Sequence, residues 1–183
     1  MYLKQNRMFH RISILDIIKA HFRTLRSLNQ SVGDKSIYWR DIITFFALPI
    51  ILSYIFYILK LNLNSQVSNL IAIISIFGGF LFNLLAIIYS YIDKINVPTA
   101  SIIKKKFANE INANISFCIL LSIFIVLLLL AYSFFPASHC GILLTYASQL
   151  VEYLIYYLLI LFFLTLLMVL SRVFTLLQKE GQG

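Results

Sequence analysis

Four long apolar segments restrict what this chain can fold into. A helix needs roughly 20 residues to cross a hydrocarbon core, and inside a bilayer its backbone amides must be satisfied within the segment. The sequence therefore predicts an all-α integral membrane protein with four transmembrane helices. A hydrophobic content of 61% supports this, because soluble domains average about half apolar residues. The expected spans are 42–60, 70–92, 115–135 and 147–171.

The distribution of positive charge predicts the orientation in the membrane. Fourteen of the 15 Lys and Arg residues lie in or next to the N-terminal region 1–41, the loop 93–114 and the tail 172–183, and only Lys60 lies on the other side. Cytoplasmic loops of membrane proteins are enriched in Lys and Arg. We therefore expect both termini and the 93–114 loop in the cytoplasm. The basic N-terminus has no early apolar core or cleavage site, so we expect no signal peptide.

Residues 8–29 form a pattern typical of an amphipathic helix at a membrane surface. A further cytoplasmic helix is expected over 99–112, and the last apolar segment continues without a breaker as far as Leu177. In the 8–29 segment the apolar positions recur at three- and four-residue spacing, and basic positions occupy another face. The apolar positions are Leu15, Ile18, Phe22 and Leu25, and the basic ones are Lys19, Arg23 and Arg26.

The sequence contains no pattern of a known catalytic centre. It has no Gly-rich phosphate loop and no His-Glu-x-x-His pattern, and its three histidines belong to no Ser-His-Asp arrangement. His139 and Cys140 are adjacent but have no further ligands near them, so we expect no metal site. We predict that the protein is not an enzyme and needs no cofactor.

A few polar residues within the apolar segments are candidates for pore-lining or gating. Glu152 is the one acidic residue in an expected span, and ionisable groups inside a membrane are costly. Gln149 and Tyr156 share its helix face, so this stripe either forms a carboxylate ring at a pore mouth in an oligomer or reaches water at the interface. Asn83 follows Gly79 by one helical turn, where it either packs across a helix interface or contacts ions.

The cytoplasmic basic residues allow three interpretations. They set the topology and attract anionic headgroups, or bind an anionic ligand such as a nucleotide or single-stranded DNA, or dock an acidic partner protein. The residues concerned are Arg11, Lys19, Arg23, Arg26, Lys104, Lys105 and Lys106.

The layout resembles that of membrane effectors of bacterial antiviral systems. The segments that carry this resemblance are the Ile17–Arg26 helix, Trp39-Arg40-Asp41, Phe45–Pro49, and Ile76–Leu85 with its two glycines and Asn83. The whole chain is similar in layout to the membrane effector of the Hailong antiphage system. That resemblance implies a homotetrameric channel-like protein in the inner membrane of a bacterium. It also implies a partner nucleotidyltransferase whose short single-stranded DNA products restrain the effector until phage nucleases remove them.

The four-span membrane subunit of the Kiwa defence system has a comparable layout. There the implied role is sensing infection at the envelope and signalling to a cytoplasmic protein. Two functions are therefore expected for this chain. The first is an oligomeric channel-like effector, gated from the cytoplasm by an anionic nucleotide or DNA oligomer, that disrupts the membrane and causes growth arrest or death. The alternative is a non-conducting sensor or anchor that recruits a cytoplasmic partner. A scaffold or assembly factor is a third possibility.

Overall fold

The protein is all-helical throughout the part that the structure, a computed structural model, describes. The described residues are 14–27, 35–59, 61, 63–95, 102–134 and 141–180 of 183. They contain helices but no strand, which confirms the all-α part of the predicted fold class. The helices are α1 (Ile14–Ser27), α2 (Lys35–Ile58), α3 (Leu63–Ile95), α4 (Ile102–Ser133) and α5 (Gly141–Glu180).

Three of these helices are long and apolar enough to cross a membrane. The suitable segments are Leu63–Ile92 of α3, Phe107–Ser133 of α4 and Tyr146–Thr175 of α5. The apolar part of α2, Ile43–Ile58, is shorter and extends over about 24 Å at the α-helical rise, against a hydrocarbon core of about 30 Å. The chain is thus suited to a membrane through three helices, and the fourth crossing and the orientation remain predictions.

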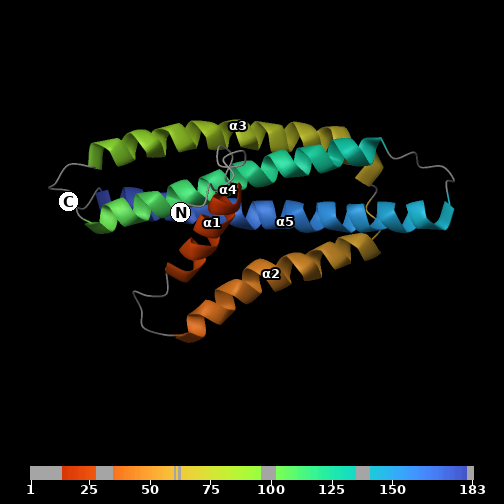
Figure 1. The fold of residues 1–183 in the computed structure, drawn as a ribbon, viewed down its shortest axis with the longest axis horizontal. Helices are drawn as coiled ribbons and strands as arrows, with labels where there is room; N and C mark the ends of the chain where they lie inside the picture. Colours follow the sequence, from red (N-terminus) through yellow and green to blue (C-terminus); the bar gives the residue numbers. More distant parts are fainter. Residues whose placement is uncertain are drawn as a thin grey trace, which may run out of the picture.

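Four helices alternate in direction along the long axis of the molecule (Figure 1). The start of α2, the end of α3, the start of α4 and the end of α5 lie at one end, which we call the basic end because the sequence places most Lys and Arg in or beside these segments. The end of α2, the start of α3, the end of α4 and the start of α5 lie at the other, the far end. Helix α1 lies across the bundle, steeply inclined to α4 and α5.

Helix α4 is central to the packing. It packs against α3, α5 and α1, while α2 packs on α5. Fully buried side chains fill these contacts, among them Ile74 of α3, Ile115 and Ile125 of α4, and Ile155 and Phe162 of α5. Burial of a large aliphatic or aromatic side chain contributes about 1.5–3 kcal/mol where water is the alternative, and dispersion contacts act in lipid as well. The interior of one chain is therefore a packed apolar core.

Gly78 brings α3 close to α4. A Cβ atom added at Gly78 would lie 3.2 Å from the Ser122 Oγ, whereas one added at Gly79 would meet nothing within 4 Å. The Ser122 hydroxyl donates to the Ile119 carbonyl oxygen at 2.8 Å, which holds it in place. Of the two adjacent glycines, Gly78 permits the close helix contact and Gly79 faces outward.

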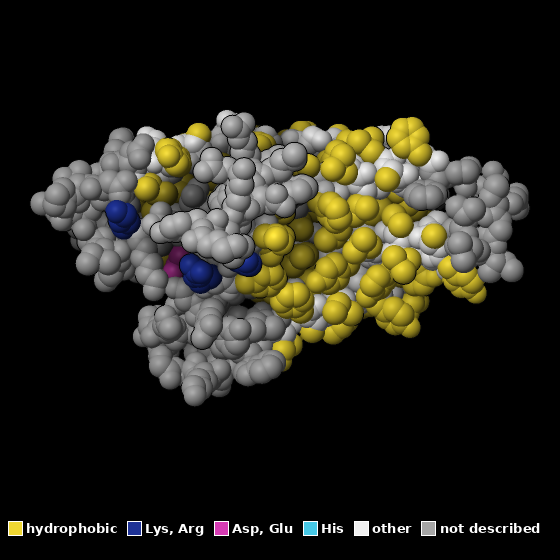
Figure 2. Space-filling view, viewed as in Figure 1, with side chains coloured by type: hydrophobic (Ala, Val, Ile, Leu, Met, Phe, Trp, Pro, Cys, Tyr) yellow, Lys and Arg dark blue, Asp and Glu magenta, His cyan; other side chains and the backbone are white. Residues whose placement is uncertain are grey.

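Large apolar side chains cover the outside of the bundle. Figure 2 shows them over the part of the surface toward the far end, at the right, whereas the visible Lys, Arg, Asp and Glu side chains lie toward the basic end. An exposed apolar surface of this extent suits a lipid environment or contact with another protein. Among the exposed side chains are Ile76, Phe80, Leu127, Leu167 and Leu170.

Two helices are longer than the sequence pattern indicated. Helix α4 joins the expected cytoplasmic helix 99–112 to the third apolar segment, since 102–133 contains no Pro or Gly to interrupt it. Helix α5 has 40 residues, about 60 Å at the α-helical rise, and therefore extends well beyond a hydrocarbon core of about 30 Å.

Candidate functional site

Helix α1 turns a polar face toward the bundle and a basic face away from it. His21 and Thr24 are buried, at 2% and 5% exposure, whereas Lys19 and Arg23 are exposed. At 100° per residue these pairs lie on opposite sides of the helix. Leu15 is 67% exposed, so part of the apolar stripe predicted from the sequence faces outward. The outward part of that stripe suits lipid, while the contact with the bundle includes both polar and apolar side chains of α1.

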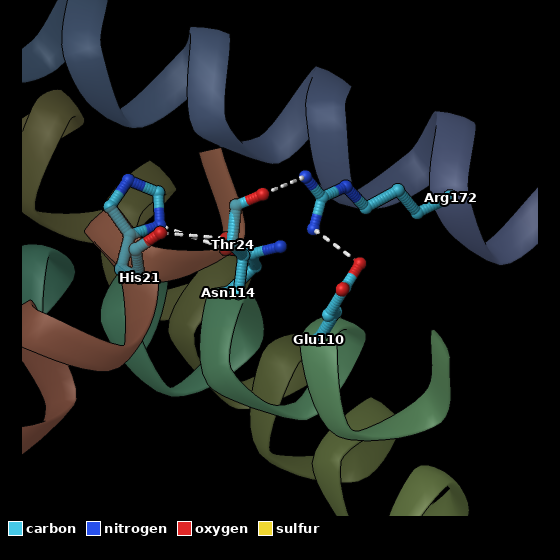
Figure 3. Close-up of polar contacts among 5 residues, drawn as sticks. All are labelled: His21, Thr24, Glu110, Asn114 and Arg172. Carbon is cyan, nitrogen blue, oxygen red and sulfur yellow. Dashed lines mark hydrogen bonds and ion pairs between the residues drawn. The ribbon is translucent and has the colours of Figure 1, made fainter. Parts of the chain in front are cut away.

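Asn114 of α4 is the acceptor that holds α1 (Figure 3). Its Oδ1 lies 2.9 Å from His21 Nδ1 and accepts from the Thr24 hydroxyl at 2.7 Å. The same hydroxyl lies 2.7 Å from the His21 carbonyl oxygen, and its single hydrogen serves one acceptor at a time. Since an amide oxygen only accepts, His21 carries its proton on Nδ1. Asn114 is fully buried.

Arg172 and Glu110 extend this cluster to α5. Arg172 Nη2 donates to the Thr24 carbonyl oxygen at 3.5 Å, and Arg172 Nη1 lies 3.9 Å from Glu110 Oε2. Both side chains are largely buried, with 5% and 12% exposure. Figure 3 shows Arg172 reaching from α5 toward Thr24 of α1 and Glu110 of α4. We call these five residues, His21, Thr24, Glu110, Asn114 and Arg172, the docking cluster, since they join α1, α4 and α5.

Burial keeps His21 neutral. Its ring stacks on Phe117 with centroids 3.9 Å apart and planes 7° from parallel. The pKa of His21 is lowered to about 4, chiefly by loss of solvent; the Asn114 hydrogen bond opposes this shift, and the positive charge of Arg172 adds to it. A charged imidazolium therefore disfavours the docked position of α1.

The docking cluster fixes one position of α1, and one of its buried amide donors lacks a hydrogen-bond partner among the described residues. The Asn114 Nδ2 donor is buried with no hydrogen-bond partner in the part of the chain that the structure describes, and an unmet buried donor costs about 1–3 kcal/mol. An apolar contact tolerates sliding, whereas hydrogen bonds at 2.7–2.9 Å fix one register. The arrangement thus defines one docked position for α1.

Sequence reasoning missed the docking cluster. Asn114 was treated as part of a loop, Arg172 served only to set the topology, and His21 and Thr24 lie between the apolar positions of the amphipathic pattern. One signal was present: Glu110 and Arg172 are opposite charges at the same end of neighbouring antiparallel segments. Two such groups near the membrane are expected to pair.

The predicted anion-binding residues are placed only in part. Lys19 and Arg23 lie on the exposed face of α1, and Lys105 is exposed near the start of α4. Arg11 lies outside the described residues, as do the side chains of Arg26, Lys104 and Lys106. The three described cations are thus at the basic end, beside the docking cluster.

The predicted pore residues of α5 meet at the far end. Gln149 is exposed and Glu152 half-buried, and both line a cavity of about 650 Å³ with residues of α2, α3 and α4. Buried Tyr156 donates to the Leu61 carbonyl oxygen at 2.6 Å and lies 3.3 Å from Glu152 Oε1. Asn83, on α3, is exposed on the outside of the chain and takes no part in this cavity.

No group of three or more His, Cys, Asp or Glu side chains is close enough to hold a metal ion among the residues that the structure describes. No protein-family model, curated protein or solved structure matches the chain.

Proposed function

We propose that this protein is an oligomeric, channel-like membrane effector that is controlled from the cytoplasmic side by an anionic nucleotide or single-stranded DNA oligomer. One observation carries the proposal: α1 presents exposed Lys19 and Arg23 on one face while the docking cluster fixes its other face to α4 and α5. An anion that binds the outer face of α1 is thereby coupled to helices that suit a membrane.

The coupling works through the position of α1. A ligand shifts a conformational equilibrium only by its difference in affinity for the two states. A polyanion that also contacts cations at the start of α4, such as Lys105, binds the docked state better than the undocked one. Its binding restrains α1, and its removal releases α1 from the docking cluster and allows α4 and α5 to rearrange.

Conduction requires several copies of the chain. The core between α3, α4 and α5 is packed with apolar side chains, so an aqueous path forms around a symmetry axis between subunits. We favour a homotetramer, as the resemblance to the Hailong effector implies, with Glu152 and Gln149 near one pore mouth. The same resemblance supplies the biological setting, antiphage defence by membrane disruption in a bacterium.

The test is ion flux through the purified protein in liposomes, with and without short single-stranded DNA at near-physiological salt. We expect flux that depends on the oligonucleotide. No flux in any state, from protein shown to be folded and oligomeric, would contradict the channel proposal.

A matched set of variants tests the ligand site. Neutralising Lys19, Arg23 and Arg26 together to Gln should abolish oligonucleotide binding at near-physiological salt. At lower salt, where residual binding is measurable, it should reduce the slope of log affinity against log salt by about 2, because each phosphate contact to a single strand contributes about 0.7. The single variant Lys105→Gln removes one proposed contact and should reduce the slope by less than 1. Equal binding by the triple variant and the unchanged protein would place the ligand elsewhere.

The second candidate is a non-conducting membrane sensor or anchor that recruits a cytoplasmic partner. The packed apolar core favours it, since one chain needs no rearrangement to serve as an anchor. It predicts a stable complex with a partner protein and no conductance. The liposome experiment separates the two functions.

A further inference from the structure

The far-end cavity is distinct from the docking cluster and from the proposed control site. It has a volume of about 650 Å³ and is built from α2, the connection after it, α3, α4 and α5. The polar side chains in the lining are Tyr57, Asn64, Tyr132, Gln149 and Glu152.

Glu152 is the charged group in this lining, among the residues that the structure describes. A carboxylate has about four acceptor positions. The one hydroxyl hydrogen of Tyr156 is placed better for the Leu61 carbonyl oxygen at 2.6 Å than for Glu152 at 3.3 Å. The carboxylate therefore keeps most of its accepting capacity for a group inside the cavity.

The lining suits an organic cation better than a metal ion. Hard metal ions prefer several carboxylate or carbonyl ligands at once, and no cluster of three acidic or His side chains occurs in the described part of the chain. An ammonium group instead needs a carboxylate, neutral acceptors and aromatic faces. Glu152, the amide oxygens of Asn64 and Gln149, and the rings of Tyr57 and Tyr132 supply these.

The depth of the cavity agrees with this chemistry. Tyr132 lies at the end of the segment Phe107–Ser133 of α4, and Leu63 begins the segment Leu63–Ile92 of α3. The lining is thus located where three apolar helices reach the membrane surface, the depth at which lipid headgroups lie.

We propose that the far-end cavity binds an ammonium group through the Glu152 carboxylate and the tyrosines around it. The ammonium belongs either to a phosphatidylethanolamine headgroup or to a soluble primary amine. This site does not depend on the proposed function, since a conducting oligomer and a passive anchor would both hold it.

The experiment measures binding to the full chain in nanodiscs and, separately, binding of ethanolamine to the full chain in detergent. Native mass spectrometry counts retained phosphatidylethanolamine against phosphatidylglycerol, and calorimetry measures ethanolamine. We expect Glu152→Gln to weaken binding about tenfold or more, because it removes a charge-assisted hydrogen bond. Asp16→Asn, which changes charge equally on an exposed residue of α1, should leave it unchanged.

The outcomes distinguish a lipid headgroup from a soluble amine as the source of the ammonium group, and they include results that would overturn the proposal. Retention of phosphatidylethanolamine without ethanolamine binding assigns the site to lipid, and binding of both assigns it to the ammonium group alone. Tyr57→Leu, which removes a ring without changing charge, should also weaken binding and serves if Glu152→Gln does not fold. Binding of neither probe would overturn the proposal, and so would equal binding by the Glu152→Gln variant. Binding that arises only after Lys60→Gln would likewise overturn it, with Lys60 as the occupant.

Discussion

At the scale of single residues, the feature that the sequence indicates least is the buried group of polar side chains where α1 contacts the bundle. His21 and Asn114 are both buried and bonded to each other at 2.9 Å. Each was read in the sequence as part of a helix surface or a loop. Buried polar groups of this kind contribute little net stability but fix one arrangement, since leaving a partner unmatched costs more than making the bond gains.

Acidification should release α1. The pKa of His21 is about 4 in the docked state and near its ordinary value of 6.5 when α1 is free. The free state therefore binds more protons between these values, so docking is fully stable above about pH 6.5 and weakens as pH falls toward 4. The free energy of docking that is lost is on the order of 3 kcal/mol.

Hydrogen exchange of α1, corrected for its intrinsic pH dependence, measures the stability of the docked position at each pH. His21→Gln should remove the dependence, and equal protection at pH 4.5 and 7.5 in the unchanged protein would contradict it.

Asn114 should matter more than its neighbour on the same helix. Asn114→Ala removes the acceptor for His21 and Thr24 and should weaken the docking of α1 by about 1–3 kcal/mol. Asn112→Ala is the matched control, since that side chain is half-buried and the hydrogen bond from Ser116 reaches its backbone carbonyl, which the substitution keeps. Exchange protection of α1 should fall in the first variant and hold in the second. Equal loss in both would assign the effect to helix propensity.

At the scale of helices, close packing between α3 and α4 depends on one glycine. Gly78→Val should force the two helices apart, because even a Cβ atom there would lie 3.2 Å from the Ser122 Oγ. Overpacking of this kind costs about 1–3 kcal/mol. Gly79→Val, whose added Cβ meets nothing within 4 Å, is the control for β-branching. The thermal unfolding temperature in detergent measures both, and an equal decrease would mean that helix propensity, not the contact, is responsible.

The positions of the helices were easier to predict from the sequence than the contacts between them. Long apolar runs identify α3, α4 and α5 because a bilayer demands a continuous helix. The joining of 99–112 to the third segment was missed, since charged residues at 104–106 suggested a separate cytoplasmic element. The docking cluster was missed for another reason: His21 and Thr24 are 93 and 90 residues away from Asn114 in sequence, and hydropathy carries no information about which polar side chains will share a hydrogen bond.

At the scale of the whole molecule, the outer surface is apolar and the helices pack around an apolar core, with a cavity at the far end. In the proposed channel the chain conducts as an oligomer, with Glu152 near the pore mouth of each subunit. Glu152→Gln should then alter cation selectivity without changing the oligomer number, because it removes the charge that attracts cations and keeps the size of the side chain. Single-channel recording and the mass of the complex measure these two properties. Unchanged currents would mean that Glu152 has no role in conduction and serves only in the far-end cavity.

The docking cluster also sets an order of events during synthesis. Helix α1 leaves the ribosome early, yet Asn114 follows His21 by 93 residues and Arg172 follows Thr24 by 148. At about 5–20 residues per second, α1 waits roughly 7 to 30 s for its binding site to be complete. During that time its exposed apolar residues, such as Leu15 and Phe22, can rest on the bilayer surface. A nascent chain, or one truncated before Asn114, therefore carries an undocked α1.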